Sequence, residues 1–392
     1  MLVNKKYYIT IWQDSKSPCV IKVINQNLLP FRFEILSFKK SDEIIRAIKN
    51  MAIRGAPLIG IAAAYCLYLA AIEGQTLHKN NFTKFKRYIF NKADVLKKSR
   101  PTAINLSYVI DLVFRSIKLN VFSSQLPFKS REKSCVDNFL IEKCIHVLSK
   151  EANRLALENI HECKKIGEYG YKVFKEIYIK KKLKCLNILT HCNAGWLACI
   201  DYGTATSPIY EAYKKGINLH VWVEETRPRN QGSLLTAWEL KQMNIPHTVI
   251  TDNAGGYVMC KGLVDVVIVG SDRTTLRGDV INKVGTYKTA LAASDNKIPF
   301  FVALPTSSFD PSLTKVRDIK NVPIEERSGN EVKYAYGLHN KNFSKVMISN
   351  PGSRVINYSF DITPARLVSG LITNKGIIKP NIKSIKKILA IA

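Results

Sequence analysis

The sequence lacks the short motifs that mark common metal and cofactor sites. Its nine cysteines and seven histidines include no C-x-x-C pair and no H-E-x-x-H segment, which are spacings typical of redox dithiols and zinc sites. No G-x-G-x-x-G occurs either, so the phosphate-binding turn of dinucleotide folds is missing. We therefore expect neither a metal nor a cofactor.

Long apolar runs are also scarce. The longest, from Leu58 to Ile72, has 15 residues, fewer than the roughly 20 that a bilayer span needs. The opening MLVNKKYYITIWQD has no apolar segment followed by a small-residue cleavage site, so we expect no secretory signal. The odd number of cysteines, scattered along the chain, is typical of reduced thiols. Together these features predict a cytoplasmic protein that does not bind membranes.

Acidic residues are few. The chain has 31 acidic and 59 basic residues and a formal net charge of +28, a balance that nucleic-acid-binding proteins also show. Most of the basic residues are lysines spread along the chain, without the clustered arginines and interleaved aromatic residues of a nucleic-acid surface. We therefore do not expect nucleic acid as the main partner. Such a charge can instead steer an anionic, phosphorylated substrate.

The first part of the chain predicts a small sheet followed by helices. Aromatic and β-branched runs in residues 1–40 predict short antiparallel strands. Helical spacing begins at Ser41, which we predict as a helix N-cap. Residues 116–138 are polar and irregular, which predicts a long loop, and helical periodicity returns from Phe139 to Tyr178.

A basic run at residues 180–184 marks a linker between two domains. The length of 392 residues, with 46% hydrophobic residues, is sufficient for two cores. We place a smaller, mostly helical α+β domain at residues 1–179 and a second domain at residues 180–392.

The second domain alternates between strand and helix patterns. The apolar runs LNILTH, INLHVWVEE, HTVITD, VDVVIVG and PFFVALP alternate with segments of helical spacing, and we predict a late helix at Ile362–Thr373. This alternation predicts an α/β fold with a Rossmann-like, doubly wound parallel sheet. Because VDVVIVG is apolar except for Asp265, it predicts a strand covered on both faces.

Two arginines precede predicted helices. Pro57 suits the first turn of a helix, because it has no N–H to leave unpaired. Arg54, Gly55 and Ala56 would then lie at the positive helix end, where outward N–H groups can hold a phosphate or hydroxyl. The alternative is a buried helix whose arginine caps a neighbour. Arg100 lies where a proline ends one helix, and there it can reach a cleft or stay in solvent.

Polar groups follow the ends of the predicted parallel strands. They are Cys192 after LNILTH, Arg227 and Gln231 after INLHVWVEE, Asn253 after HTVITD, and Asp272, Asn282 and Lys283 after VDVVIVG. Ligands of open α/β sheets bind outside the carboxyl ends of the strands, so we predict one shared crevice. The alternatives are that Asp272 caps a helix and that Cys192 is a small packed residue.

The expected chemistry depends on two of these groups. A helix N-terminus after Cys192 would favour its thiolate, while His191 would point to the opposite face of the strand and is no base partner. An aspartate with a pKa of about 3.9 is a poor acid at neutral pH, so Asp272 must be desolvated to act as one. We therefore predict that Lys283 contacts substrate and leaves Asp272 partly screened from its charge.

Longer segments extend this pattern over most of the chain. They are RGAPLIGIAAAY, SRPTAINL, THCNAGWLA, YGTAT, ETRPRNQGSLLTAWEL, TDNAGGYVM, VGSDRTTLRGDVINKVGTY, IPFFVALPTSSFD, VPIEER and FDITPARLVSGLITNKGI. In them the chain resembles the methylthioribose-1-phosphate isomerases, part of a wider family with the regulatory subunits of translation initiation factor 2B and the ribose-1,5-bisphosphate isomerases. The sequence departs from the family pattern at Ser271, at Arg277 and at NYSFD from Asn357. None of these departures removes a reactive group.

The resemblance implies an aldose–ketose isomerase of methionine salvage that acts as a homodimer. It implies that Asp272 moves a proton and that Cys192 stabilises the transition state or shares the transfer. It further implies that the phosphorylated sugar is held by Arg54, Gly55, Ala56, Arg100, Gln231, Asn282 and Lys283. Two alternatives stay open: an isomerase of 5-deoxyribose 1-phosphate or ribose 1,5-bisphosphate, and a non-catalytic regulatory subunit, which would need neither the thiol nor the carboxyl group.

Overall fold

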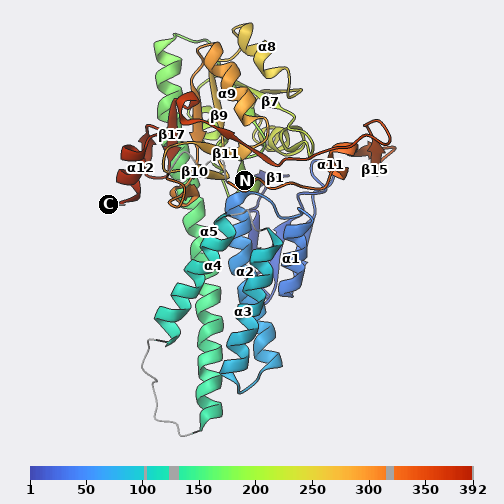
Figure 1. The fold of residues 1–392 in the computed structure, drawn as a ribbon, viewed down its shortest axis with the longest axis vertical. Helices are drawn as coiled ribbons and strands as arrows, with labels where there is room; N and C mark the ends of the chain where they lie inside the picture. The colour runs from blue at the N-terminus through green and yellow to red at the C-terminus, as the bar shows by residue number, and fades with distance from the viewer. Residues whose placement is uncertain (101–103, 123–131, 315–321, 391–392) are drawn as a thin grey trace.

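A computed structural model describes residues 1–100, 104–122, 132–314 and 322–390. The molecule is elongated, with a helical part at one end and a part built on a large sheet at the other (Figure 1).

The first 40 residues form short antiparallel strands, as the sequence predicts. Strands β3 (Ile11–Gln13), β4 (Ile21–Ile24) and β5 (Ile35–Phe38) make one sheet in that order, and β1 (Leu2–Val3) pairs with β2 (Lys6–Tyr7). Ile11 and Ile21 are fully buried against the helices that follow.

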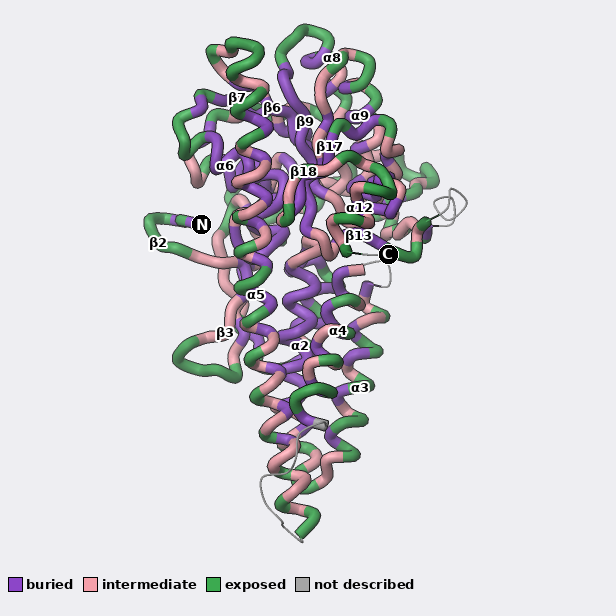
Figure 2. The backbone as a smooth tube through the Cα atoms, turned by 90° about the vertical axis from the view of Figure 1, so that its left-hand side faces the viewer, coloured by how far each residue is buried: buried purple, intermediate pink, exposed green. Residues whose placement is uncertain are grey.

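The helical part surrounds one apolar helix. Its members are α1 (Ser41–Lys49), α2 (Ala56–Leu77), α3 (Phe82–Ser99), α4 (Ile104–Ile117) and the first half of α5 (Lys133–Lys180). By length and composition α2 is apolar enough to cross a membrane, but 78% of its most apolar window is buried in the protein. A helix that is apolar on all sides is typical of a core position, and Figure 2 shows α2 mostly buried among its neighbours.

The long helix α5 connects the two parts. It has 48 residues, which at about 1.5 Å per residue gives a length of about 70 Å. Ile141 and Leu148 belong to the helical core, whereas Ile166 and Phe174 pack against the large sheet. The helix ends at Lys180, beside the expected domain boundary, and contributes side chains to both cores.

The large sheet has seven strands in the order β18-β17-β12-β9-β6-β7-β8. Their bounds are β6 (Leu186–His191), β7 (Leu219–Glu224), β8 (His247–Ile250), β9 (Val266–Val269), β12 (Phe300–Ala303), β17 (Gly370–Thr373) and β18 (Gly376–Ile378). All pairs are parallel except the edge pair of β17 and β18. From β8 to β17 the chain order is 3-2-1-4-5-6, the doubly wound order of Rossmann folds, so the winding reverses between β6 and β9.

Helices cover both faces of this sheet. On one face the end of α5, α6 (Ser207–Lys214) and α7 (Ala237–Gln242) pack on Ile188 and Val221. On the other face α8 (Gly255–Cys260), α9 (Thr286–Asp295) and α12 (Ile382–Leu389) pack on Leu189 and Val267. The predicted α/β class with a doubly wound sheet is therefore confirmed.

A second, four-stranded sheet follows β9 directly. It contains β13 (Phe309–Asp310), β10 (Arg273–Thr275), β11 (Val280–Lys283) and β16 (Phe360–Thr363), in that order. Beyond it, α11 (Asn330–Lys333) leads into a hairpin of β14 (Tyr334–His339) and β15 (Asn342–Met347), which projects from the body (Figure 1).

The late helix predicted at Ile362–Thr373 is wrong. The segment ends β16, forms a 3-10 turn at Ala365–Leu367, and then forms β17. Leu371 and Ile372 are fully buried, and β17 pairs with β12 as a parallel strand. A run of four residues between turns is compatible with a helix or with a strand. Pairing with β12 makes this run a strand.

Two further expectations in the helical part need correction. The loop predicted at 116–138 is shorter, because α4 continues into a π-helix at Lys118–Phe122 and α5 begins at Lys133; residues 123–131 lie outside the described residues. The N-cap of α1 is Lys40, not Ser41. The N–H and hydroxyl of Ser41 donate instead to Glu73 at 2.7 Å each.

Candidate active site

A cavity lies between the start of α2 and the carboxyl edge of the large sheet. The space open to the centre of a water-sized molecule is about 120 Å³, where a single water needs roughly 10–15 Å³. All nine residues predicted for the site line it: Arg54, Gly55, Ala56, Arg100, Cys192, Gln231, Asp272, Asn282 and Lys283. The cavity therefore has the size and the polar groups of a small-molecule site.

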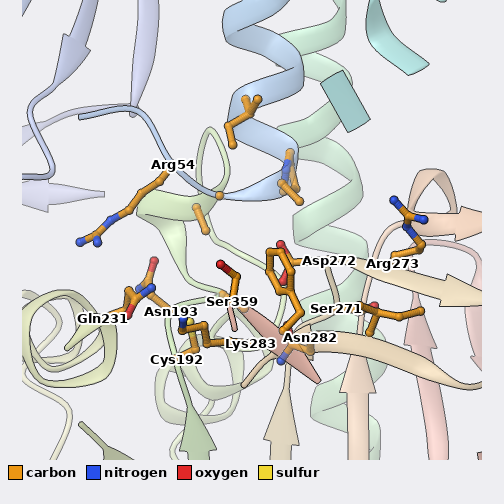
Figure 3. Close-up of a pocket in the computed structure, with 18 of the residues that line it drawn as sticks. Arg54, Cys192, Asn193, Gln231, Ser271, Asp272, Arg273, Asn282, Lys283 and Ser359 are labelled. Atoms are coloured by element: carbon orange, nitrogen blue, oxygen red, sulfur yellow. The ribbon is translucent and has the colours of Figure 1, made fainter. Parts of the chain in front are cut away.

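Cys192 and Asp272, the two groups predicted to react, come from the strands between which the winding of the sheet reverses. Cys192 follows β6, and Asp272 lies three residues beyond β9, the neighbouring strand. Crevices at such reversal points are where open α/β sheets bind ligands. In Figure 3 Cys192, Lys283 and Asp272 surround the same space below the start of a helix.

The start of α2 approaches the Cys192 loop very closely. Gly55 is the N-cap of α2 and has a φ of +109°. A Cβ at this position would lie 2.4 Å from Cα and O of Ala198, so only glycine fits. The helix N-terminus, with its unpaired N–H groups, therefore faces the cavity.

Arg54 is held from behind by a buried glutamine. Gln26 accepts a hydrogen bond from Nε of Arg54 at 3.3 Å and donates to the Arg54 carbonyl at 3.2 Å and to that of Leu197 at 2.8 Å. Gln26 is 1% exposed. Arg54 lines the cavity, and in Figure 3 its side chain extends away from Asp272.

A hairpin holds the acid and the lysine. Strands β10 and β11 are antiparallel, and the N–H of Asp272 donates to the carbonyl of Ile281 at 3.1 Å. Lys283 ends β11 and is buried. Next to it, Asn282 donates to the Thr286 hydroxyl at 3.1 Å.

Gln231 offers an unused acceptor. Its Oε1 is buried and has no hydrogen-bond partner among the described residues. Because buried polar atoms in native proteins are nearly always paired, this oxygen is suited to a hydroxyl of a bound ligand.

Burial shifts the pKa of both reactive groups upward. It raises the pKa of Asp272 to about 6, against the opposing charges of Arg100 and then Lys283. It raises the pKa of the Cys192 thiol to about 11, although Lys283 opposes the shift. The predicted shift of Asp272 is confirmed. The predicted thiolate is wrong, because a single 3-10 turn at Trp196–Ala198 follows Cys192 and desolvation outweighs the nearby cations.

The cations of the site are also desolvated. Burial, and then the charge of Arg229, lower the pKa of Arg54 to about 9, and burial lowers that of Lys283. With a pKa of about 9, Arg54 remains positive at neutral pH, so its side of the cavity attracts anions.

A chain of ion pairs that the strand-end argument missed closes one side. Glu325 accepts from Arg100 at 2.8 Å and from Arg327 at 3.0 Å. Glu331 accepts from Arg327 at 2.8 Å and Arg229 at 2.9 Å. Burial raises the pKa of Glu331, but the two arginines outweigh it and hold it at about 2. The segment VPIEER was the available signal for this network.

Two groups expected in the crevice do not line it. Arg227 turns away and donates to the Val332 carbonyl at 2.9 Å. Asn253 is exposed, beyond β8 and away from the cavity.

One cluster has ligand atoms spaced closely enough for a metal ion, but these atoms make hydrogen bonds within the protein. Ligand atoms of His191, Glu224 and Asp252 lie within 4.8 Å of one another. However, Nδ1 of His191 is 2.7 Å from Glu224, and both Asp252 oxygens accept backbone N–H groups of Thr226 and Arg227 at 2.7 Å. The donor atoms are engaged in hydrogen bonds, which explains the cluster without an ion. His191 itself is among the residues that line the cavity, contrary to the expectation from its strand position, but its ring nitrogens face Glu224 and the Val284 carbonyl.

The strand order and the cavity define the class of protein. It is an α/β protein with a small-molecule crevice where the winding of the sheet reverses, between β6 and β9. Residues 52–380 match the family described as "Initiation factor 2 subunit family", and the chain belongs to this family.

Within it, the chain belongs with the methylthioribose-1-phosphate isomerases. It is 44% identical to the protein of that name from Desulfatibacillum aliphaticivorans, over 99% of this chain and 98% of the relative. It also resembles the crystal structure of 5-methylthioribose 1-phosphate isomerase from Pyrococcus horikoshii OT3, with 34% identity, a TM-score of 0.79, and coverage of 98% of this chain and 96% of that one. A structure titled as translation initiation factor eIF-2B, subunit delta, from A. fulgidus is similar at 34% identity and a TM-score of 0.73, covering 98% of this chain and 100% of that one.

Proposed function

We propose that the protein converts 5-methylthio-α-D-ribose 1-phosphate to 5-methylthio-D-ribulose 1-phosphate, a step of methionine salvage. The observation that carries this proposal is that Cys192 and Asp272 line one cationic cavity. The names of the relatives, which cover nearly the whole chain, support it.

The anion-binding side of the cavity would hold the phosphosugar. The start of α2 supplies the N–H groups after Arg54, and Arg100 and Lys283 add positive charge. The free oxygen of Gln231 and the Asn282 amide are suited to sugar hydroxyls. Because charge-assisted hydrogen bonds are the strong ones, we assign most of the binding affinity to the phosphate.

Asp272 acts as the acid that opens the ring. An aldose 1-phosphate is a locked acetal, so an acid must protonate the ring oxygen while the phosphate stays on C1. With a pKa of about 6, about a tenth of Asp272 is protonated at pH 7, far more than for an exposed aspartate. A hydrogen then moves from C2 to C1. As the 2-hydroxyl becomes the ketone, its proton returns to the Asp272 carboxylate, so the acid is regenerated and the product is an isomer of the substrate.

Cys192 assists as a neutral thiol. Its raised pKa keeps the proton on sulfur at neutral pH, so it stabilises the transition state or shares the hydrogen transfer. Running the reaction in D₂O separates two routes. Deuterium at C1 of the product would exclude a pure hydride shift between the carbons and indicate transfer through a phosphoenolate.

A substrate panel tests the function. Purified protein is incubated with the 1-phosphates of 5-methylthioribose and 5-deoxyribose and with ribose 1,5-bisphosphate, and ketose formation is followed with a carbonyl reagent. We expect the highest kcat/KM with the methylthio sugar. A higher kcat/KM with another sugar would change the assigned substrate but not the assigned reaction. Binding of a sugar without turnover would favour a regulatory subunit.

Assembly and location form the remaining part of this proposal. We infer a homodimer in the cytoplasm. The resemblance to the isomerases supports the dimer, and the nine free cysteines suit a reducing compartment. Light scattering of the purified protein at several concentrations tests the dimer, and a single monomer mass throughout would overturn it.

A further inference from the structure

His191, which lines the cavity, forms a buried pair with Glu224. His191 ends β6 and precedes Cys192, and Glu224 ends β7, where the two residues are partners in the sheet register. Their side chains are 1% and 0% exposed, and Nδ1 of His191 lies 2.7 Å from Oε2 of Glu224. The proposed reaction uses neither group.

The other ring nitrogen reaches the turn after the site lysine. Nε2 of His191 lies 2.9 Å from the carbonyl oxygen of Val284, which follows Lys283. The next residue, Gly285, has a φ of +106°, and a Cβ there would lie 2.7 Å from Cε1 of His191. The imidazole therefore packs directly on this turn and connects it to the end of β6.

Counting donors fixes the number of protons in the pair. A neutral imidazole has one N–H, yet both ring nitrogens face oxygen atoms of Glu224 and Val284. A neutral imidazole beside an ionised carboxylate can make only one of these two hydrogen bonds. To make both, the pair needs one additional proton. That proton lies on the ring or on Glu224, and in both cases the pair has no net charge.

A pair without net charge is compatible with this environment. Isolated charges are costly to bury, whereas hydrogen-bonded pairs are tolerated. Thr289 of α9 also donates to Oε2 of Glu224 at 2.9 Å. The pair therefore connects four elements: β6, β7, the turn after β11, and α9.

We propose that His191 is a positioning residue of the isomerase: with Glu224 it forms a singly protonated pair that fixes the Lys283 turn against the strand end that carries Cys192. The role is indirect, because both ring nitrogens face protein oxygens, those of Glu224 and of the Val284 carbonyl. Misplacing a reacting group by about 1 Å can reduce a rate by about 10²-fold. This inference rests on the proposed function, since its kinetic test needs turnover.

Three variants test the kinetic effect. His191→Phe keeps the ring volume and removes both contacts, and we expect kcat to fall about 50-fold with KM within threefold of the wild type. In Glu224→Gln the new amide can donate to Nδ1 of His191, while the Nε2–H of His191 donates to the Val284 carbonyl. Both contacts are kept, so we expect kcat within fivefold of the wild-type value. His220→Phe, on β7 and outside the cavity, is the control and leaves kcat unchanged. An unchanged kcat for folded His191→Phe, or an equal loss in Glu224→Gln, would overturn the proposal.

Nuclear magnetic resonance tests the pair without turnover. In ¹⁵N-labelled protein we expect an imidazole N–H resonance that exchanges slowly with solvent, because Val284 accepts it inside the protein. The resonance disappears in His191→Phe and remains in His220→Phe. Absence of a protected imidazole N–H would overturn the pair, whereas a protected resonance in a protein that turns over no sugar phosphate would count against the proposed function alone.

Discussion

Cys192 and Asp272 reach the same cavity from β6 and β9, the neighbouring parallel strands between which the winding of the sheet reverses. They are far apart in the sequence, and only the sheet brings them together. Burial raises the pKa of both, so a thiol and a partly protonated carboxyl group line one cavity. This arrangement favours acid–base chemistry over nucleophilic catalysis by a thiolate.

Asp272→Asn tests the acid directly. The amide keeps the shape of the side chain but cannot protonate the ring oxygen, so we expect kcat to fall by about 10³-fold, as is usual for loss of a general acid. Product binding, measured by calorimetry, should stay within threefold. Asp295→Asn, exposed at the end of α9, is the matched control, and full activity of Asp272→Asn would refute the assignment.

The same variant should stabilise the protein at high pH. The folded-state pKa of about 6 lies above the ordinary value of 3.8, so the wild type loses stability as pH rises from about 4 to about 6, and the loss is complete above that. The full shift corresponds to about 3 kcal/mol, and water in the open cavity reduces it to roughly 1–3 kcal/mol. Urea denaturation should show Asp272→Asn more stable than the wild type at pH 8 and equal to it near pH 4. An equal or lower stability at pH 8 would show that the carboxylate is not desolvated.

The sequence predicts the parts of the fold that depend on local pattern. VDVVIVG is apolar except for Asp265, and LNILTH has the apolar residues Leu186, Ile188 and Leu189; both form central strands of the sheet. The short run at Gly370–Thr373 carries no such signal, because its strand structure depends on pairing with β12. Likewise, Arg227 follows a strand as predicted, but its direction is set by the Val332 carbonyl, which belongs to a distant segment.

The site was predictable where strand ends or helix starts define it. The position of Asp272 followed from the strand before it, and that of Gly55 from the proline-initiated helix. Glu331 could not be placed in this way, because it belongs to a short helix after an irregular segment and reaches the site through two arginines. The pKa of Cys192 depends on burial by several elements, which no local pattern reports.

Cys192 should react slowly with alkylating agents at neutral pH. Because the thiolate is the nucleophile and the pKa is about 11, the rate with iodoacetamide should rise about tenfold per pH unit between pH 7 and 9. Exposed Cys19 and Cys260 serve as internal controls, and peptide mass spectrometry separates the sites. Product should protect Cys192 but not the controls. Rapid, pH-independent alkylation of Cys192 at pH 7 would instead indicate a thiolate.

Gly55→Ala tests the contact between α2 and the Cys192 loop. Its control is Gly216→Ala, because Gly216 also has a positive φ, +82°, but nothing lies within 4 Å of its added Cβ. The backbone conformation alone costs each variant about 1–2 kcal/mol. In Gly55→Ala the Cβ also meets the Ala198 backbone at 2.4 Å, so the loop must move. We therefore expect an unfolding free energy at least about 1 kcal/mol below that of Gly216→Ala and a kcat/KM reduced more than tenfold, against less than twofold for the control. Equal activity of the two variants would show that the cavity does not depend on this close approach.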